Sequence, residues 1–255
     1  MNLRTSSSEV YRPTVSTAKQ RGKLFGIGVG PGAPDLLTLR AIEILKSINV
    51  VCIPRSKADN DSLALTVAGK YIPATAEIME VATPMTRDRQ VLEAEWRRGA
   101  EKIAAKLNEG LNVAFITIGD AMLFSTYTYL LKKVCQLLPD IEVESVPGIT
   151  SFAAAAAHLN TALAEGNEKL AIIPAVDDPG QLREVLRLFP NAVLMKVAGQ
   201  YNEIVDVLTD MGLKDSAVYI SRLGYPDQFV TDDLDSMRQK KRDYLSLILV
   251  KQGGF

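Results

Sequence analysis

The chain has few of the residues that most often bind metals or form disulfides. Its 255 residues include one histidine and two cysteines, Cys52 and Cys135, which lie in separate apolar segments without metal-ligand spacing. No apolar run reaches the length of a membrane span, and the formal net charge is only -1. We therefore expect no bound metal, two reduced thiols in a cytoplasmic protein, and neither a membrane nor a nucleic acid as partner.

The N-terminus differs in composition from the rest of the chain. Residues 1–21 are polar and rich in serine and threonine, and they lack the apolar stretch of a signal peptide. We expect a disordered leader over residues 1–21, followed by enough chain for one or two domains with a large core.

Short apolar runs alternate with helical patterns after the leader. Strands are expected at residues 23–30, 49–53, 77–81 and 113–118, and helices at 35–48, 63–71, 87–108 and 125–138. The expected buried face of the helix at 35–48 holds Leu36, Leu39, Ile42 and Leu45. Pro54 is expected to end the second strand. This β-α order predicts a mostly parallel sheet that is covered on both faces.

A second unit is expected from residue 140 onward. Strands at 141–146, 169–173, 192–197, 217–221 and 244–250 alternate with helices at 152–159, 181–188 and 201–211. Placing the boundary near Pro139-Asp140 gives two α/β domains, at residues 22–139 and 140–255. No low-complexity linker separates them, so we expect the two domains to pack against each other.

Two loops at expected strand ends carry functional signals. Gly119-Asp120 follows the strand at 113–118, at the edge where open α/β sheets place their ligands. Gly119 lets a ligand approach the backbone, while Asp120 offers a fixed negative charge or serves as a helix N-cap. The loop at residues 147–151 ends in Thr150 and Ser151, whose hydroxyls can cap the next helix or contact a ligand.

A third loop, at residues 28–33, formally fits the G-x-G-x-x-A dinucleotide fingerprint. Pro31 removes one of the amides that a pyrophosphate would use. Arg55 follows the second strand, where an acid would bind a ribose hydroxyl, and an arginine there suits a 2′-phosphate instead. An NADP-dependent oxidoreductase therefore stays open as an alternative, as does a glycine turn that only packs a helix on the sheet.

Taken together, the three loops resemble the tetrapyrrole (corrin/porphyrin) methylases in order and spacing over about residues 22–250. The resemblance is carried by Gly28, Gly30-Pro31-Gly32, Leu36-Leu37-Thr38, Ala41, Gly119-Asp120, Ser125 and Pro147-Gly148-Ile149-Thr150-Ser151. Within the family, the chain is most similar to members that methylate C-20 in cobalamin synthesis. The residues that carry this finer resemblance are Gly26, Pro34, Pro54-Arg55-Ser56, Thr126-Tyr127, Phe152 and Met195-Lys196. One departure is Ala121, where the family usually has a proline, so this loop is expected to be less rigid.

The resemblance implies a fold, a cofactor and partners. Two α/β domains of the class III methyltransferase type would hold S-adenosylmethionine in the cleft between them, usually in a homodimer. The substrate would be precorrin-2 or cobalt-factor II, its cobalt-bearing counterpart. The implied cofactor contacts are Pro31, Gly119, Asp120, Met122, Leu123, Thr126, Thr150, Ser151, Met195 and Gly224.

Such a substrate carries many carboxylates, which cations near the crevice would bind. Arg55 and Lys57 follow the second strand, and Arg87 and Arg89 open the long helix. Solvated surface charge is the alternative for each of them. Arg222, before a glycine, could serve either the cofactor or the substrate.

The sequence does not identify a catalytic base. His158 is expected to have a structural or surface role in an alanine-rich helix, and no pattern singles out Tyr127, Asp35 or Glu165. Two further functions therefore stay open. One is a methylase of the same fold that acts at a different ring position, and the second is a tetrapyrrole carrier without turnover.

Overall fold

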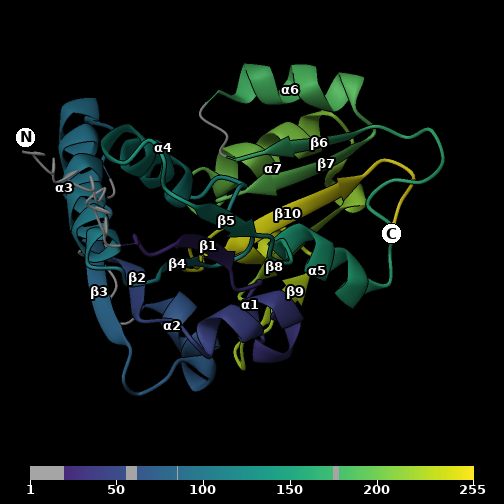
Figure 1. Cartoon of the computed structure of the whole chain (residues 1–255). Coiled ribbons are helices and arrows are strands. Elements are labelled where there is room, and N and C mark those ends of the chain that lie inside the picture. The colour runs from purple at the N-terminus through teal and green to yellow at the C-terminus, as the bar shows by residue number, and fades with distance from the viewer. Residues whose placement is uncertain (1–19, 56–61, 85, 175–177) are drawn as a thin grey trace, which may run out of the picture.

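A computed structural model describes residues 20–55, 62–84, 86–174 and 178–255. The expected leader at residues 1–21 lies almost wholly outside this part of the chain, as do Ser56 and Lys57. The described residues form two α/β domains, each built on its own sheet (Figure 1). None of the described helices is long and apolar enough to span a bilayer.

The first domain is built on a five-stranded sheet in the order β3-β2-β4-β1-β5, and every pairing in it is parallel. Its strands are β1 (Leu24–Gly28), β2 (Val50–Arg55), β3 (Glu77–Ala82), β4 (Val113–Thr117) and β5 (Val143–Val146). The predicted parallel sheet is thereby confirmed. Strand β1 lies between β4 and β5, so the loops that follow these three strands leave the sheet at one edge.

Helices cover both faces of the first sheet, as predicted. They are α1 (Leu39–Leu45), α2 (Leu63–Ala68), α3 (Arg89–Asn108) and α4 (Tyr127–Leu137), with short 3-10 helices at Pro34–Leu36 and Gly69–Tyr71. Helices α1 and α2 pack with Ile27, Val51 and Ile116 on one face, whereas α3 and α4 pack with Val50 and Phe115 on the other. The two-sided cover explains why strands such as β4 are apolar throughout instead of alternating.

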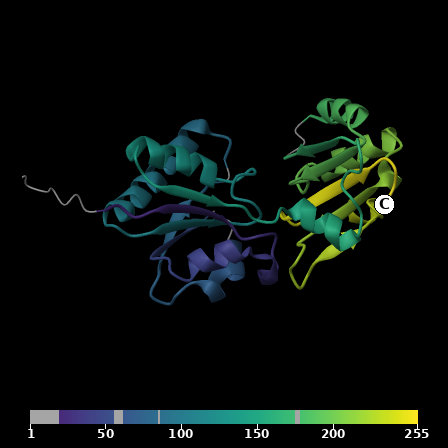
Figure 2. The ribbon, with the colours of Figure 1, turned by 45° about the vertical axis from the view of Figure 1, so that its right-hand side comes forward.

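The second domain is built on a mixed sheet in the order β6-β7-β10-β8-β9. Its elements are α5 (Ser151–Leu159), β6 (Leu170–Ile173), α6 (Pro179–Leu188), β7 (Asn191–Met195), α7 (Tyr201–Asp210), β8 (Ala217–Ser221), β9 (Phe229–Thr231) and β10 (Ser246–Lys251), with 3-10 helices at Lys214–Ser216 and Asp235–Met237. Helices α6 and α7 cover one face of the sheet, and α5 covers part of the other. Figure 2 shows a single segment of chain crossing from the first domain to the second, directly before α5.

The face predicted for the helix at residues 35–48 is confirmed at Leu45, which is fully buried, but is wrong at Leu39. A proline-containing 3-10 turn comes first, and α1 begins only at Leu39, capped by the Thr38 hydroxyl. Leu39 is 86% exposed, while the buried positions include Ala41, Ile44 and Ile48. The 3-10 turn and the cap shift the start of the helix, so the apolar spacing counted from Leu36 places Leu39 on the buried side when it is in fact exposed.

The prediction that Pro54 ends the second strand is also wrong, because β2 continues to Arg55. The Val50 amide donates to Asn112 on the β4 side, and alternation places Pro54 on that same side. Pairing between β2 and β4 has already ended at Cys52, whereas pairing with β3 continues past Pro54. The missing amide of proline therefore interrupts no ladder.

Strand β5 was expected in the second domain, but it pairs with β1 in the first sheet. The Glu144 carboxylate fixes it there, since Arg40 donates to both of its oxygens (2.7 and 2.9 Å) and Lys23 lies 3.1 Å away. The first sheet thus ends at Val146, later than the expected boundary near residue 139. The short strand β9 was not predicted at all.

The ion pairs of Glu144 should make stability depend on pH. Hydrogen bonds from Arg40 and then Lys23 lower the pKa of Glu144 from its ordinary value to about 2. A lowered pKa contributes stability that is present above the unfolded-state value, near 4.3, and is lost as the pH falls toward about 2. We expect Glu144→Gln to lower the melting temperature at pH 7 by about 1–3 °C, measured by calorimetry.

The matched control is Glu101→Gln, whose exposed carboxylate lies 3.7 Å from Arg97 within one helix and should contribute less. The deficit of Glu144→Gln should shrink as the pH falls from about 4.5 to about 2. A deficit that stayed constant through this range would exclude the Glu144 carboxylate as its cause.

Candidate functional site

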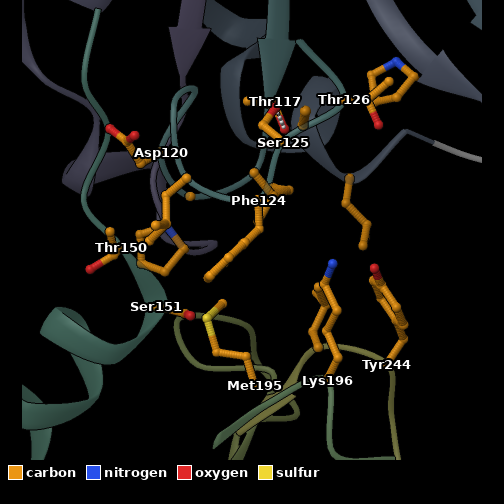
Figure 3. Close-up of a pocket in the computed structure, with 18 of the residues that line it drawn as sticks. Thr117, Asp120, Phe124, Ser125, Thr126, Thr150, Ser151, Met195, Lys196 and Tyr244 are labelled. Atoms are coloured by element: carbon orange, nitrogen blue, oxygen red, sulfur yellow. Dashed lines mark hydrogen bonds between the residues drawn. The ribbon is translucent and has the colours of Figure 1, made fainter. Parts of the chain in front are cut away.

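A cavity of about 800 Å³ is lined by residues of both domains. The first domain contributes the loops after β1, β4 and β5, and the second contributes the ends of β7 and β8 and the segment entering β10. Figure 3 shows Asp120, Phe124 and Thr126 projecting from the first domain, with Met195, Lys196 and Tyr244 facing them from the second. This is the cleft expected between the domains.

Backbone contacts between glycines bring the three predicted loops together. Gly30 and Gly119 exchange two hydrogen bonds, in which the Gly30 amide donates at 3.2 Å and the Gly119 amide at 2.7 Å. A Cβ atom on Gly148 would lie 2.1 Å from the Gly119 carbonyl oxygen, and one on Gly28 would lie 2.5 Å from it. These positions need glycine because of close backbone approach, which the sequence shows only as three separate motifs.

The Asp120 carboxylate joins two of these loops. Its Oδ1 accepts a hydrogen bond from the Met122 amide at 2.8 Å, and its Oδ2 accepts one from the Gly148 amide at 2.9 Å. Asp120 is not the N-cap of the following helix, because that position belongs to Thr126. The carboxylate lines the cavity as predicted, but its oxygens also hold the cavity wall in shape.

Most of the predicted cofactor contacts line the cavity: Pro31, Gly119, Asp120, Leu123, Thr126, Thr150, Ser151 and Met195. The Thr150 hydroxyl also caps α5 by accepting from the Ala153 amide at 3.4 Å. Met122 and Gly224 are not among the lining residues. The Met122 side chain is 54% exposed, and Gly224 packs so closely on Ala33 that a Cβ atom would lie 2.7 Å from its amide nitrogen.

The predicted substrate-binding arginines are not among the lining residues. Arg55 forms an ion pair with Glu80 on the neighbouring strand β3. Arg222 does line the cavity, but its charge is already balanced, because it lies 2.6 Å from Asp227 and 3.4 Å from Asp243. These contacts raise the pKa of Arg222 and lower that of Asp227.

The side chains considered as bases also lie outside the lining set. The Tyr127 hydroxyl is 3.1 Å from that of Ser145, and burial raises its pKa. His158 accepts a hydrogen bond at 3.0 Å from Gln228, whose carbonyl oxygen accepts from the Gly224 amide. Glu165 pairs with Lys251 at 3.0 Å. None of these groups is placed to take a proton from a molecule in the cavity.

Sequence reasoning missed part of the cavity wall. Trp96 on α3 lines the cavity and stacks on Tyr129 with 4.1 Å between ring centroids. Lys196 and Arg222, which the sequence already singles out, line it together with Phe124, and the three have left-handed backbones at φ values of 57°, 50° and 51°. Positive φ values at such residues are uncommon and cluster at functional sites. The sequence signal that could have identified these lining residues is their position after apolar strands.

Comparisons with known proteins agree with this geometry. The family model of the Tetrapyrrole (Corrin/Porphyrin) Methylases matches residues 23–237, which is well over half of the chain. A cobalt-precorrin-2 C(20)-methyltransferase of Salmonella typhimurium is 36% identical over 91% of this chain and 97% of its own. A probable enzyme of the same name from Methanocaldococcus jannaschii is 36% identical over 90% of this chain and 96% of its own.

A solved structure shares the fold. The uroporphyrin-III C-methyltransferase of Thermus thermophilus, in complex with S-adenosyl homocysteine, superposes with a TM-score of 0.62. It is 22% identical, and the match covers 91% of this chain and 99% of that one. The likeness supports the arrangement of the two domains around the cavity.

The glycine contacts can be tested with Gly148→Ala. The added Cβ atom would meet backbone atoms of Gly119 and Gly28, which cannot turn away as a flexible side chain can. We expect a melting temperature about 3–10 °C lower, together with weaker binding of S-adenosylhomocysteine. Gly69→Ala is the control, because Gly69 has a helical backbone and no described atom within 4 Å of an added Cβ. Equal melting temperatures of Gly148→Ala and Gly69→Ala would contradict the close packing of Gly148 on Gly119 and Gly28.

The Asp120 bridge can be tested with Asp120→Asn, which keeps the shape but replaces one acceptor oxygen by a donor. We expect faster hydrogen exchange at the Met122 and Gly148 amides and about tenfold weaker binding of S-adenosylmethionine. Asp178→Asn is the control, since Asp178 accepts from the Gly180 amide at 2.8 Å in the cap of α6. Unchanged affinity would remove Asp120 from the site.

Proposed function

Because the chain belongs to the tetrapyrrole (corrin/porphyrin) methylases and is therefore a methyltransferase, we propose that it transfers a methyl group from S-adenosylmethionine to C-20 of precorrin-2 in cobalamin synthesis. Two relatives at 36% identity carry cobalt-precorrin-2 in their names, which makes the cobalt-bearing form the first substrate to test. The observation that carries the proposal is the convergence of three loops on one cavity between the domains.

The chain's residues fit such a cofactor. Gly119 has a left-handed backbone, and no described atom lies within 4 Å of the position of an added Cβ, so a ligand can approach this backbone closely. The Asp120 carboxylate brings negative charge to the same wall, which favours a cationic sulfonium. Met195 and Leu123 supply apolar surface from opposite domains.

A methyl group on a sulfonium is already activated toward a carbon nucleophile. The protein's work is then to align the donor with one ring carbon and to exclude water. Opposed walls suit this task, because the first domain offers backbone groups fixed by Asp120 and the second offers the side chains of Met195 and Lys196. The proton at C-20 has to leave as well, and positioning of the substrate rather than a dedicated base dominates the proposed catalysis.

The NADP-dependent alternative loses its main support in the structure. The Gly30 amide is bonded to Gly119, so it is not available to a pyrophosphate. Arg55, the residue suited to a 2′-phosphate, pairs with Glu80 and is not among the lining residues. From the family we also propose a cytoplasmic homodimer, for which sedimentation analysis is the direct test.

Calorimetric titration with S-adenosylhomocysteine, followed by NADPH on the same preparation, tests the cofactor. We expect micromolar binding of the first and none of the second. Incubation of the enzyme with S-adenosylmethionine and cobalt-precorrin-2 should then yield one new methyl group, which NMR assigns to C-20. Methylation elsewhere on the ring would indicate a sibling activity, and macrocycle binding without turnover would indicate a carrier.

A further inference from the structure

The charged side chains along the cavity differ in whether they have hydrogen-bond or ion-pair partners. The charged residues among the described lining are Asp120, Lys196, Arg222 and Asp243. Asp120 accepts hydrogen bonds from two backbone amides, and Arg222 and Asp243 pair with each other. Within the described part of the chain, the Lys196 ammonium has neither a hydrogen bond nor an ion pair, so its charge is available to a ligand.

The backbone holds Lys196 in an unusual conformation. Its φ is 57°, in the left-handed region that glycine adopts most easily. The amide of Lys196 donates to the Ser246 carbonyl oxygen at 3.1 Å, directly after β7 stops pairing with β10. Figure 3 shows the result, in which the amine points into the cavity beside Tyr244. A long cationic side chain thus stands where the backbone alone would favour glycine.

The direction of Lys196 separates it from three of the predicted cofactor contacts but brings it toward a fourth, Thr126. In Figure 3, Lys196 and Tyr244 extend toward the side where Thr126 lies, whereas Asp120, Thr150 and Ser151 lie across Phe124. The amine therefore faces a part of the cavity away from Asp120, Thr150 and Ser151.

We propose that Lys196 binds a carboxylate side chain of the tetrapyrrole and so determines which meso carbon faces the methyl donor; this rests on the proposed function. The Lys196 ammonium has no anionic partner within the described part of the chain, and a carboxylate is the anion that this macrocycle carries. Arg222 cannot serve in the same way, since Asp227 and Asp243 already neutralise it. The single anchored ring edge limits the orientations that a nearly symmetric substrate can adopt.

The test compares Lys196→Gly, Lys196→Met and Lys196→Arg. Glycine removes the amine and also relieves the left-handed backbone, so this variant is expected to fold at least as well as the parent. We expect the KM for cobalt-precorrin-2 to rise about 10–100-fold in the glycine and methionine variants. The arginine variant should recover most of the loss, and the affinity for S-adenosylhomocysteine should change less than twofold in all three.

Asn160→Gly is the matched control, because Asn160 has the same left-handed backbone (φ 52°) at the end of α5 and is not among the lining residues. It relieves a similar backbone without removing a charge, so its KM should equal that of the parent. An unchanged KM in Lys196→Gly, or a loss of S-adenosylhomocysteine affinity equal to the rise in KM, would overturn the proposal.

Equilibrium titration of the macrocycle, followed by its absorbance, separates this proposal from the proposed function. If the parent binds cobalt-precorrin-2 without methylating it and Lys196→Gly loses that binding, the Lys196 contact stands and the proposed activity fails. If the parent methylates C-20 and both proteins bind the macrocycle equally, the activity stands and the Lys196 contact fails.

Discussion

The site depends on one carboxylate whose two oxygens hold two loops together. Asp120 accepts hydrogen bonds from Met122 in its own loop and from Gly148 in the next. The glycines at positions 28 and 148 allow their backbones to approach the Gly119 carbonyl oxygen closely enough for this bridge to form. Without either the carboxylate or the glycines, the loops after β1, β4 and β5 would no longer contact one another to form one wall of the cavity.

The two domains contribute different chemistry to the cavity. The first offers backbone groups at the carboxyl edge of a parallel sheet, a place that α/β proteins commonly use for ligands. The second offers side chains at the ends of β7 and β8, where Lys196 and Arg222 have left-handed backbones. A rigid wall of main chain suits a cofactor that is always the same, whereas projecting side chains suit the choice of a substrate.

Which features of the fold and the site could be predicted from the sequence depends on how far apart in the chain the interacting residues lie. Glycine loops and apolar strands are local signals, and from them the α/β class and the loops that form the cavity wall of the first domain could be predicted. The membership of β5 could not be, because the strand pairs with β1 far back in the chain and its supporting ion pairs join Glu144 to Arg40, which are 104 positions apart. The direction of Lys196 and the exclusion of Arg55 likewise depend on neighbours that folding alone supplies, namely Ser246 and Glu80.

The chain passes from the first sheet to the second only once, through the residues between β5 and α5. That crossing contains Gly148, the partner of Asp120, and Thr150, the cap of α5. Any change of angle between the domains must be absorbed by backbone rotation in this hinge. Since this hinge contains Thr150 of the cavity wall and the Gly148 amide that holds Asp120, closing the cleft and shaping its Asp120 side would be mechanically a single event.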